Sequence, residues 1–440
     1  NDVCPGLTGW AQIHGRDELE ISEKARLDGY YVKHLNLFMD IRCILGTIRS
    51  VLKSEGIVEG GTGAMAAQEC NKKKLLIVTN HSYMLYRFRK ELIQRLMEEY
   101  EVVISAPFVG HEDDLQKMGV RCIETEVDRR SINPVTDMKL LRTYKKILKR
   151  EKPDLVITYS IKPNIYAGYL CGKMKIPFLA NVQGLGTAFQ KPVLSDIVTV
   201  MYRTALRKVE KAFFENQANA QEFKKRRILS EEKEVVLHGA GINLEEYRYR
   251  FYPNNEKIHF LYLGRIMKEK GMDELFGAIE RLRKDGCEFV LDLVGFFEEE
   301  YKKKVEHLQK EGVVRFYGFQ QDPRPFYTQA DCVVLPSYHE GMSNVLLEAA
   351  ASGRAIITTD IPGCREAVDD GRSGMLCRVK SADSLYKAMK RFTEFSRDRR
   401  EAIGKAGREK MEKEFDKNQV VEETVKVITG NRSKQERGRL

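Results

Sequence analysis

Short apolar runs alternate with amphipathic segments over most of the chain. The first run, at residues 75–79, is followed by a polar loop at 80–86 and by helical spacing at 87–100. A second apolar run at 102–105 completes a strand–helix–strand unit. Alternation of this kind, with little sign of antiparallel pairing, predicts an α/β fold with parallel sheets covered by helices.

The same alternation returns in the second half of the chain. Its predicted strands lie at 259–263, 289–294 and 314–318, and its predicted helices at 272–284 and 298–311. A chain of 440 residues is also too long for one ordinary core, so two or three domains are expected. In each of them the carboxyl ends of the strands should meet at one edge, where α/β proteins bind ligands.

Residues 1–56 are predicted to form a separate module. Pro5 and Gly6 indicate a turn, and apolar residues recur at helical spacing over 37–53. Such a helix either packs on a core or lies in a membrane interface with its basic side chains towards the headgroups. A segment rich in Gly and small residues, 57–72, is typical of a flexible linker.

Composition narrows the class of protein. No run of about eighteen or more apolar residues occurs, so no helix is predicted to span a membrane. The nine cysteines are scattered without metal-binding spacing, as in proteins of a reducing cytosol. A net charge of +10 suits a nucleotide-sugar enzyme, an anionic lipid surface or nucleic acid, and does not choose between them. The chain does not begin with Met, and we interpret it as part of a longer protein.

Basic residues crowd three segments of the first half. They are Lys139, Arg142, Lys145, Lys146, Lys149 and Arg150, then Arg203, Arg207, Lys208 and Lys211, then Lys224, Lys225, Arg226 and Arg227. Such runs usually form solvated faces. The functional alternative is binding to anionic lipid headgroups, each basic residue contributing roughly 1 kcal/mol near the surface.

Two carboxylates bracket the start of a predicted helix at 344–352. Glu340 lies in the loop that precedes it, and Glu348 lies one to two turns inside it. The helix follows an apolar strand at 332–336, and a helix start in that position favours anions such as phosphate. Glu340 is therefore expected to meet hydroxyls or a developing positive charge. The alternative, which the residues alone leave open, is that Glu340 is a helix-start acid and Glu348 a solvated surface acid.

The stretch EGMSNVLLE, from Glu340 to Glu348, resembles the E-x7-E motif of the retaining family-four (group 1) glycosyltransferases. Three further segments stand in that family's order. They are the phosphate-binding G-R-x4-K-G of residues 264–271, the hinge-like 239–243, and the P-G-x-x-E loop of 362–366. The resemblance implies a GT-B fold: an acceptor domain at 73–250, a nucleotide-sugar domain at 251–415, and a helix at 416–430 that crosses back.

The resemblance also implies roles for individual residues. A UDP-sugar, either a UDP-hexose or a UDP-N-acetylhexosamine, would be the donor, with no cofactor and no metal ion. Arg265 and Lys270, with Gly264 and Gly271 at the family's spacing, would neutralise the departing diphosphate; the alternative is a pair of surface ion-pair partners. Glu340 would contact the donor sugar, and Glu348 would accept hydrogen bonds from the ribose. The remaining donor-binding positions are Gly264, Gly341, Met342, Ser343 and Asn344.

Acceptor-side positions follow from the same resemblance. In the family the loop after the first strand faces the acceptor, which here would place Asn80 and His81 there. Lys162, in the sequence YSIKPN, stands where many members carry a His near the sugar. It lies in a polar loop, and a helix is predicted to open at Ile165. Gly184 and Gly186 permit close backbone approach, with a tight turn as the alternative.

Residues 1–56 resemble the C-terminal end of bacterial sugar transferases, the membrane-bound polyprenyl-phosphate phosphoglycosyl transferases, through words such as PGLTGWAQ. That family's membrane helix and catalytic Asp-Glu pair lie upstream of this segment, so the resemblance implies a membrane-side context only. We expect a polyprenyl-diphosphate-linked sugar as acceptor, at the cytoplasmic face of a bacterial plasma membrane with an anionic surface, and no nucleic-acid partner. The alternatives are a phosphoglycosyl transferase, a GT-B nucleotide-sugar epimerase and a non-catalytic assembly scaffold.

Overall fold

The computed structural model describes residues 10, 21–34, 36–53, 72–128, 133–186, 189 and 192–437. They belong to two compact units, residues 1–72 and 73–440, which we describe separately. The predicted linker at 57–72 lies outside the described residues except for Lys72, and so does most of the PGLTGWAQ segment.

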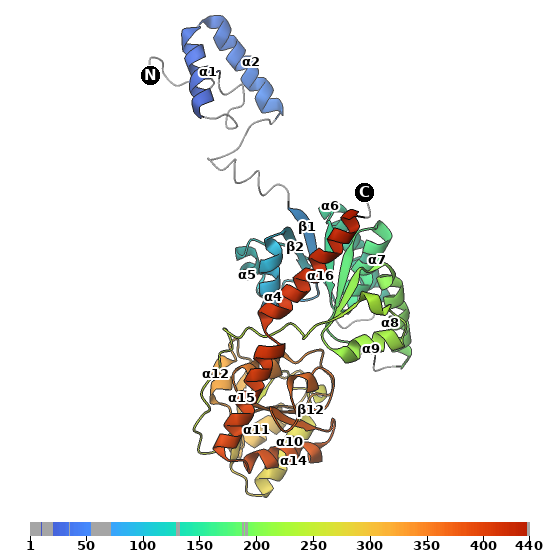
Figure 1. Cartoon of the computed structure of the whole chain (residues 1–440), viewed down its shortest axis with the longest axis vertical. Coiled ribbons are helices and arrows are strands. Elements are labelled where there is room, and N and C mark those ends of the chain that lie inside the picture. The colour runs from blue at the N-terminus through green and yellow to red at the C-terminus, as the bar shows by residue number, and fades with distance from the viewer. Residues whose placement is uncertain are drawn as a thin grey trace. The chain divides into compact units, whose positions relative to one another are not determined.

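The first unit contains two described helices, α1 (Ile21–Lys33) and α2 (Leu37–Lys53) (Figure 1). The helix predicted at 37–53 is thereby confirmed. Met39 and Cys43 of α2 are buried, whereas Phe38 is 81 % and Leu45 61 % exposed. Within this unit the apolar stripe of α2 is therefore only partly covered.

The second unit begins with a seven-stranded parallel sheet in the order β3-β2-β1-β4-β5-β6-β7. The strands are β1 (Lys73–Val78), β2 (Tyr100–Ala106), β3 (Arg121–Glu124), β4 (Leu155–Tyr159), β5 (Phe178–Val182), β6 (Lys211–Phe214) and β7 (Glu234–Val236). Its helices are α4 (Ser82–Met97), α5 (Glu112–Lys117), α6 (Pro134–Glu151), α7 (Ile161–Met174), α8 (Pro192–Ala205) and α9 (Gln217–Lys225).

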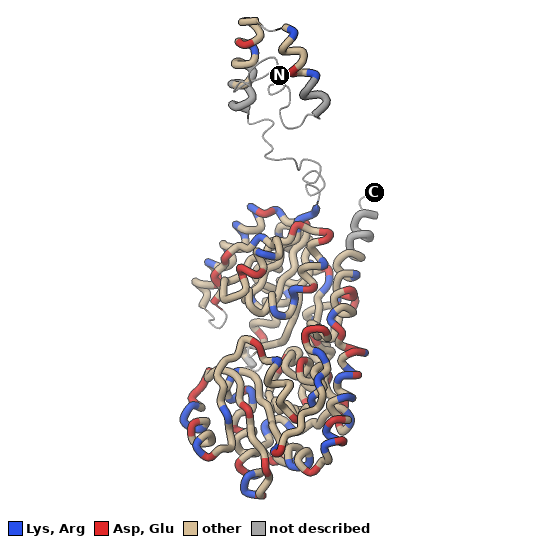
Figure 2. Tube along the Cα trace, turned by 90° about the vertical axis from the view of Figure 1, so that its left-hand side faces the viewer, with Lys and Arg blue, Asp and Glu red and all other residues tan. Residues whose placement is uncertain are grey.

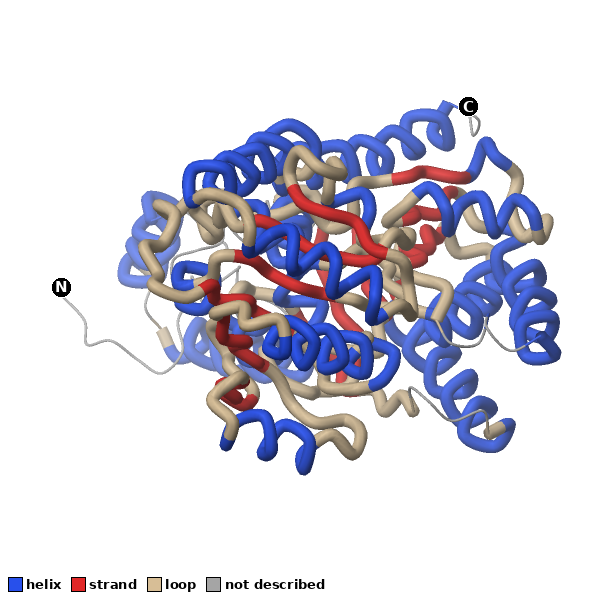
Figure 3. Tube along the Cα trace, turned by 90° about the horizontal axis from the view of Figure 1, so that it is seen from below, coloured by secondary structure: helices blue, strands red, loops and turns tan. Residues whose placement is uncertain are grey.

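Both faces of this sheet are buried, because side chains alternate along each strand. Leu76 and Val78 of β1 join the core beneath α6, α7 and α8, whereas Leu75 and Ile77 join the core beneath α4. Figure 3 shows the strands lying between layers of helices. The predicted α/β architecture with parallel strands is confirmed.

A second parallel sheet of six strands follows, in the order β10-β9-β8-β11-β12-β13. The strands are β8 (Ile258–Leu263), β9 (Phe289–Val294), β10 (Val314–Gly318), β11 (Cys332–Leu335), β12 (Ala355–Thr359) and β13 (Gly374–Cys377). Its helices are α10 (Met272–Lys284), α11 (Lys302–Lys310), α12 (Arg324–Gln329), α13 (Asn344–Ala351), α14 (Ala382–Thr393) and α15 (Arg397–Glu414). We call the two sheets with their helices the first and second domains.

The chain crosses between the domains at two adjacent places. Ile242 donates its backbone N–H to the carbonyl of Phe415 (2.7 Å), and Lys417 donates to the carbonyl of Ile242 (3.0 Å). The last helix, α16 (Lys417–Arg437), then packs along α4 of the first domain. Val421 and Val425 of α16 are part of that domain's core.

Two helices begin earlier than the sequence predicted. The predicted loop at 80–86 is wrong from Ser82 onwards, because buried Leu85 continues the apolar stripe of α4 by one more turn. The helix expected to open at Ile165 opens at Ile161. Pro163 stands in its first turn, where a missing N–H costs no hydrogen bond.

Candidate active site

The predicted donor residues lie where strands of the second sheet end. Gly264 and Arg265 follow β8, and Glu340 lies in the loop that follows β11, residues 338–343. The turns after β8 and β9 touch backbone to backbone: Gly264 donates to the carbonyl of Val294 (2.9 Å), and a Cβ built on Gly295 would lie 1.8 Å from the Gly264 oxygen. The turns after β8 and β9 can approach this closely because Gly264 and Gly295 have no side chain.

Lys270 and Glu340 form a direct ion pair. The Lys270 Nζ lies 2.5 Å from the Glu340 Oε1, and both side chains are largely buried. Gly271 makes this possible: its φ is 73°, and a Cβ there would lie 2.1 Å from the carbonyl oxygen of Pro336. The turn that carries Lys270 thus packs tightly on the segment that carries Glu340.

Arg265 lies near this pair but has a partner of its own. Its Nη1 is 2.6 Å from the Oε2 of Glu298, a residue that the sequence analysis did not single out. The Tyr262 hydroxyl donates to the Arg265 carbonyl (2.6 Å). Burial, with a smaller contribution from Glu340, raises the pKa of Tyr262, so this hydroxyl remains a donor between Arg265 and Glu340.

The 338–343 loop ends at Ser343, the N-cap of α13. The Ser343 N–H donates to the Gly363 carbonyl (2.8 Å), but the Ser343 side chain does not cap the helix. The first N–H groups of α13, from Asn344, therefore lack a side-chain acceptor, which is the arrangement that an anion can satisfy. Met342 is turned elsewhere: its Cγ would lie 2.6 Å from a Cβ on Gly239, in the hinge-like segment.

Glu348 is buried, so its interpretation as a solvated surface acid is wrong. It is 5 % exposed and accepts a hydrogen bond from the Tyr327 hydroxyl (2.8 Å). Burial raises the pKa of Glu348, while Tyr327, Arg87 and Tyr247 act in the opposite direction. The structure thus joins Lys270, Glu340 and Arg265 in one neighbourhood and turns Glu348 towards α12 and the hinge.

A polar cavity of about 110 Å³ lies at the carboxyl edge of the first sheet. Its lining is Thr79, Asn80, His81, Met84, Leu85, Arg89, Tyr159, Ser160 and Gln183, and we call it the Arg89 cavity. Ser160 has φ 75° and ψ 164°, a strained conformation for a residue other than Gly. Its hydroxyl donates to the Asn80 Oδ1 (2.9 Å). Asn80 and His81 thus both line the Arg89 cavity, and their place on the acceptor side stays a prediction.

The other predicted acceptor-side residues lie outside this lining. Lys162 stands in the first turn of α7, with its Nζ 2.7 Å from the Asp137 Oδ1. Gly186 has φ 67°, and a Cβ there would lie 2.9 Å from Ile161, so a tight turn explains it. Gly184 approaches the second domain: its Cβ would lie 3.5 Å from the Gly341 Cα.

Comparisons with known proteins agree with this geometry. Residues 245–410 match the family described as "Glycosyl transferases group 1", residues 74–216 match "Glycosyl transferase 4-like", and residues 1–54 match "Bacterial sugar transferase". The chain is a glycosyltransferase, and its residues 245–410 are similar to the group 1 family. It is 28 % identical over 364 residues to the N,N'-diacetylbacillosaminyl-diphospho-undecaprenol alpha-1,3-N-acetylgalactosaminyltransferase of Campylobacter jejuni, covering 78 % of this chain and 95 % of that protein.

Solved structures show the same fold. A glycosyltransferase of Rickettsia africae superposes with a TM-score of 0.66 at 20 % identity, covering 81 % of this chain and 98 % of its own. Anabaena HepE in complex with UDP-glucose gives 0.67 at 16 % identity, covering 81 % and 99 %. The second unit of this glycosyltransferase therefore has the GT-B fold.

Three buried residues of this glycosyltransferase were missed by the sequence analysis. Arg89 of α4 pairs with Glu215, which follows β6, at 2.7 Å. Burial raises the pKa of Glu215 to about 7, against the lowering effect of Arg89 and Lys417. Asn216 comes next and contacts the 338–343 loop. The polar pair directly after the apolar Phe213-Phe214 run was the only signal for them in the sequence.

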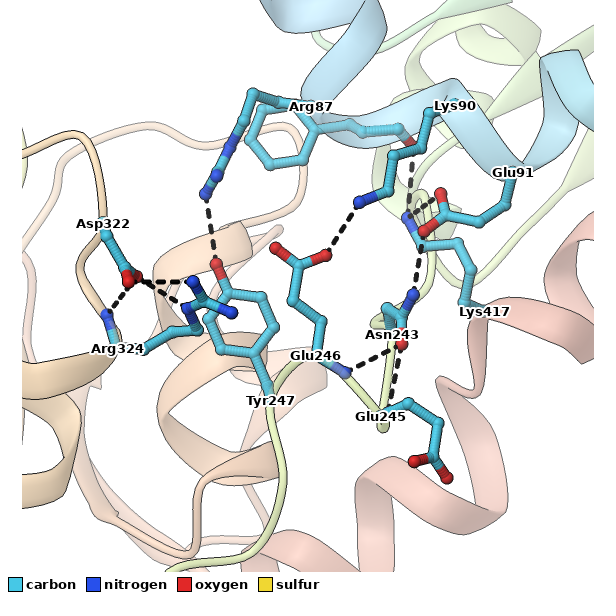
Figure 4. A network of polar contacts seen from close by, with 11 residues as sticks. Arg87, Lys90, Glu91, Asn243, Glu245, Glu246, Tyr247, Asp322, Arg324 and Lys417 are labelled. Carbon is cyan, nitrogen blue, oxygen red and sulfur yellow. Dashed lines mark hydrogen bonds and ion pairs between the residues drawn. The ribbon is translucent and has the colours of Figure 1, made fainter. Parts of the chain in front are cut away.

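A hinge network joins the two domains of this glycosyltransferase beside the chain crossings (Figure 4). It consists of Arg87, Lys90, Glu91, Asn243, Glu246, Tyr247 and Lys417. Lys90 pairs with Glu246 (3.0 Å), and the Lys417 Nζ donates to the Phe88 carbonyl (3.1 Å). Burial lowers the pKa of Lys417 to about 8.

Proposed function

We propose that this glycosyltransferase transfers a hexose or N-acetylhexosamine from a UDP-sugar to a polyprenyl-diphosphate-linked sugar, with retention of configuration. The observation that carries the proposal is the Lys270–Glu340 ion pair beside Arg265. A diphosphate attracts both cations. Once Lys270 turns to the phosphate, the Glu340 carboxylate is released towards the donor sugar.

The donor reaction follows from that exchange of partners. The acceptor hydroxyl oxygen bonds to the anomeric carbon as the bond to the β-phosphate oxygen breaks, and UDP leaves with the electron pair and finally the hydroxyl proton. Arg265, Lys270 and the first N–H groups of α13 stabilise the charge that develops on the diphosphate. Glu340 stabilises the positive charge on the sugar ring. No step in this scheme requires a metal ion or a cofactor.

The nucleotide base has two exposed aromatic side chains available. Phe296 and Phe319 follow β9 and β10, and their ring centroids lie 6.3 Å apart. The Phe296 carbonyl accepts the N–H of Ile266, directly after Arg265. A planar base can stack on such rings, while Glu348, the predicted ribose partner, would have to exchange its bond to Tyr327 for a ribose hydroxyl.

The Arg89 cavity suits the terminal sugar of the acceptor. Its lining offers amide and hydroxyl groups, and the Arg89 charge is already matched by Glu215. A neutral ligand rich in hydroxyls can satisfy such groups. The Campylobacter relative, by its name, acts on a diphospho-undecaprenol-linked sugar, which supports an acceptor of this class.

A lipid-linked acceptor also calls for contact with a membrane surface. In the part of the chain that the structure describes, no helix has the length and apolar character needed to cross a membrane. One face of α8 exposes Val193 (76 %), Ile197 (53 %) and Val200 (58 %), at helical spacing. Figure 2 shows Lys and Arg interspersed with Asp and Glu over the second unit. We therefore assign lipid contact, at the cytoplasmic face of the plasma membrane, to the apolar face of α8 more than to the basic segments.

A donor screen tests the proposed function. Purified protein is given UDP-sugars with and without a polyprenyl-diphosphate-linked sugar, and UDP release, product mass and anomeric configuration are measured. We expect UDP only with acceptor, and an α-linked product from an α-linked donor. Release of UMP would indicate a phosphoglycosyl transferase, and conversion of the UDP-sugar without acceptor an epimerase.

Matched variants connect the activity to the site. Lys270→Gln should lower kcat/KM by about 100-fold or more, because the diphosphate loses a direct cation. Lys268→Gln, two residues away on an exposed side chain, should change it by less than about 2-fold. If Glu340→Ala and Arg265→Ala left both the assay and the cellular glycan unchanged, the protein would be a scaffold rather than an enzyme.

A further inference from the structure

The 338–343 loop is held by the first domain as well as by its own. The Asn216 Nδ2 donates to the Gly341 carbonyl (2.5 Å), across the two domains. A Cβ on Gly341 would lie 1.7 Å from the Gln183 carbonyl oxygen, and a Cβ on Gly363 would lie 2.5 Å from the Gly341 oxygen. The peptide next to Glu340 is thus enclosed on both sides.

We propose that Asn216 is a positioning residue for Glu340: it fixes the Gly341 peptide, and through it the direction in which the Glu340 carboxylate faces the donor sugar. The inference rests on the proposed function, in which Glu340 acts on that sugar. Asn216 belongs to the first domain, so the place of a donor-side acid is set by the acceptor-side domain.

The two ends of the Asn216 side chain have different partners. Its Oδ1 accepts the N–H of Asn219 (2.9 Å) and caps α9, while its Nδ2 donates to Gly341. Because the cap fixes the oxygen, it also fixes the direction of the amide nitrogen. Asn216 is 2 % exposed, so water cannot readily replace either partner.

The residues that hold Gly341 and Asn216 in place also contact the Arg89 cavity. Glu215, the preceding residue, pairs with Arg89, and its Oε2 would lie 3.3 Å from a Cβ on Gly341. Gln183, whose carbonyl abuts Gly341, also lines the cavity. Gln183 and the Glu215–Arg89 pair therefore support both the proposed acceptor subsite and the 338–343 loop. A displacement of the subsite would reach the loop through these residues.

Asn216→Asp and Asn216→Ser separate positioning from capping. Both replacements keep an oxygen that caps α9. The carboxylate has no N–H to donate to Gly341, and the Ser side chain is too short to reach it. We expect kcat to fall by about 10- to 100-fold, because a small misplacement of a catalytic group costs that much. The KM for acceptor and the Kd for UDP alone should stay within about 3-fold.

Asn133→Asp is the matched control. The Asn133 Oδ1 caps α6 by accepting the N–H of Val135 (2.9 Å), at an exposed position. The same substitution there should leave kcat within about 2-fold, since an Asp caps as well as an Asn. Thermal unfolding of Asn216→Ser and Asn133→Asp should stay within a few degrees of the wild type, whereas Asn216→Asp, which buries a carboxylate against the Gly341 carbonyl, should unfold at a lower temperature.

A double variant ties the effect to Glu340. In the Glu340→Gln background, Asn216→Asp should cost less than about 2-fold more, since two residues that act as a unit are not additive. Full additivity, an unchanged kcat in Asn216→Asp, or a parallel loss of UDP binding and thermal stability would each overturn the inference. If Glu340→Gln itself left the rate unchanged, the proposed function would fail instead, and independently.

Discussion

Two contacts between the first and second domains differ in the kind of atoms that form them. Beside the chain crossings, charged and polar side chains face each other, as Lys90 faces Glu246 and Arg87 faces Tyr247. At the 338–343 loop, by contrast, the Gly341 backbone packs directly on the Gln183 carbonyl. The hinge network joins the domains through long polar side chains. At the 338–343 loop, the backbone of one domain packs on the backbone of the other.

The difference indicates which contact tolerates movement. Partly exposed ion pairs exchange readily with water and contribute about 0.2–1 kcal/mol each, so the hinge network can rearrange at low cost. A backbone contact that leaves no room for a methyl group cannot yield without separating the domains. We therefore expect the catalytic geometry to depend on the loop contact and motion between the domains to occur at the hinge.

Gly341→Ala should have the largest effect. The added Cβ would lie 1.7 Å from the Gln183 carbonyl oxygen, where the obstacle is backbone and cannot turn aside. The loop must move, and kcat/KM should fall by more than about 100-fold. Steady-state kinetics measures this, and a circular dichroism spectrum checks that the fold persists.

Gly184→Ala is the partner variant on the facing strand end. Its Cβ would lie at an ordinary distance of 3.5 Å from the Gly341 Cα. The rate should therefore change by less than about 3-fold. Equal losses in Gly184→Ala and Gly341→Ala would show that the contact is not as tight as its geometry indicates.

Lys417→Met should change how the free energy of unfolding depends on pH. Burial lowers the pKa of Lys417 from 10.5 to about 8, so between those values the unfolded chain holds more protons and the wild type gains stability as pH rises. From pH 8 to pH 10 the wild type should gain about 2 kcal/mol relative to Lys417→Met. Urea unfolding at the two pH values measures this, and parallel curves would contradict it.

Protonation of Glu215 should lower the rate of the reaction at acidic pH. Its pKa of about 7 means that it gains a proton as pH falls from 8 to 6, leaving buried Arg89 without its counter-charge; the other groups that face it are Lys417 and Tyr159. The rate should fall about tenfold over that range. Glu215→Gln should be slow throughout and lack this fall, so a fall that persists in this variant would assign the titration to another group.

The Lys90–Glu246 pair should matter least. Its side chains are about a quarter exposed, so Lys90→Gln with Glu246→Gln should cost less than about 1 kcal/mol of stability. The rate should change by less than about 2-fold. A loss as large as that of Gly341→Ala would reverse the contrast between the two contacts.

The fold could be predicted further than the site. Alternating apolar runs predicted both sheets, because strands buried on two faces have a clear composition. Helix starts were missed where the evidence lies in tertiary contacts: Ser82 begins α4 with its hydroxyl bonded to the Gly110 carbonyl.

Within the site, motif residues from neighbouring turns could be placed, and Lys270 does meet Glu340. Asn216 could not be identified, because its bond to Gly341 forms only when the domains dock, and Glu215 could not be identified, because its partner Arg89 lies 126 residues away in the chain. Lys162 stays a prediction: its Nζ is paired with Asp137, and the residue lies outside the lining of the Arg89 cavity. Local spacing predicts what one domain does with its own loops, and says little about what the other domain brings to them.

The packing of α16 on the first domain determines how the chain can be divided into separately folding domains. The helix follows the second domain in the chain, yet Val425 and Ile428 fill the core of the first. The second domain is in effect an insertion into the first. Removing α16 should therefore expose apolar surface on α4 and make the first domain aggregate, although α16 lies far from α4 in the sequence. Separate expression of the first domain requires two cuts and a new junction between 236 and 417, whereas the second domain is one continuous segment.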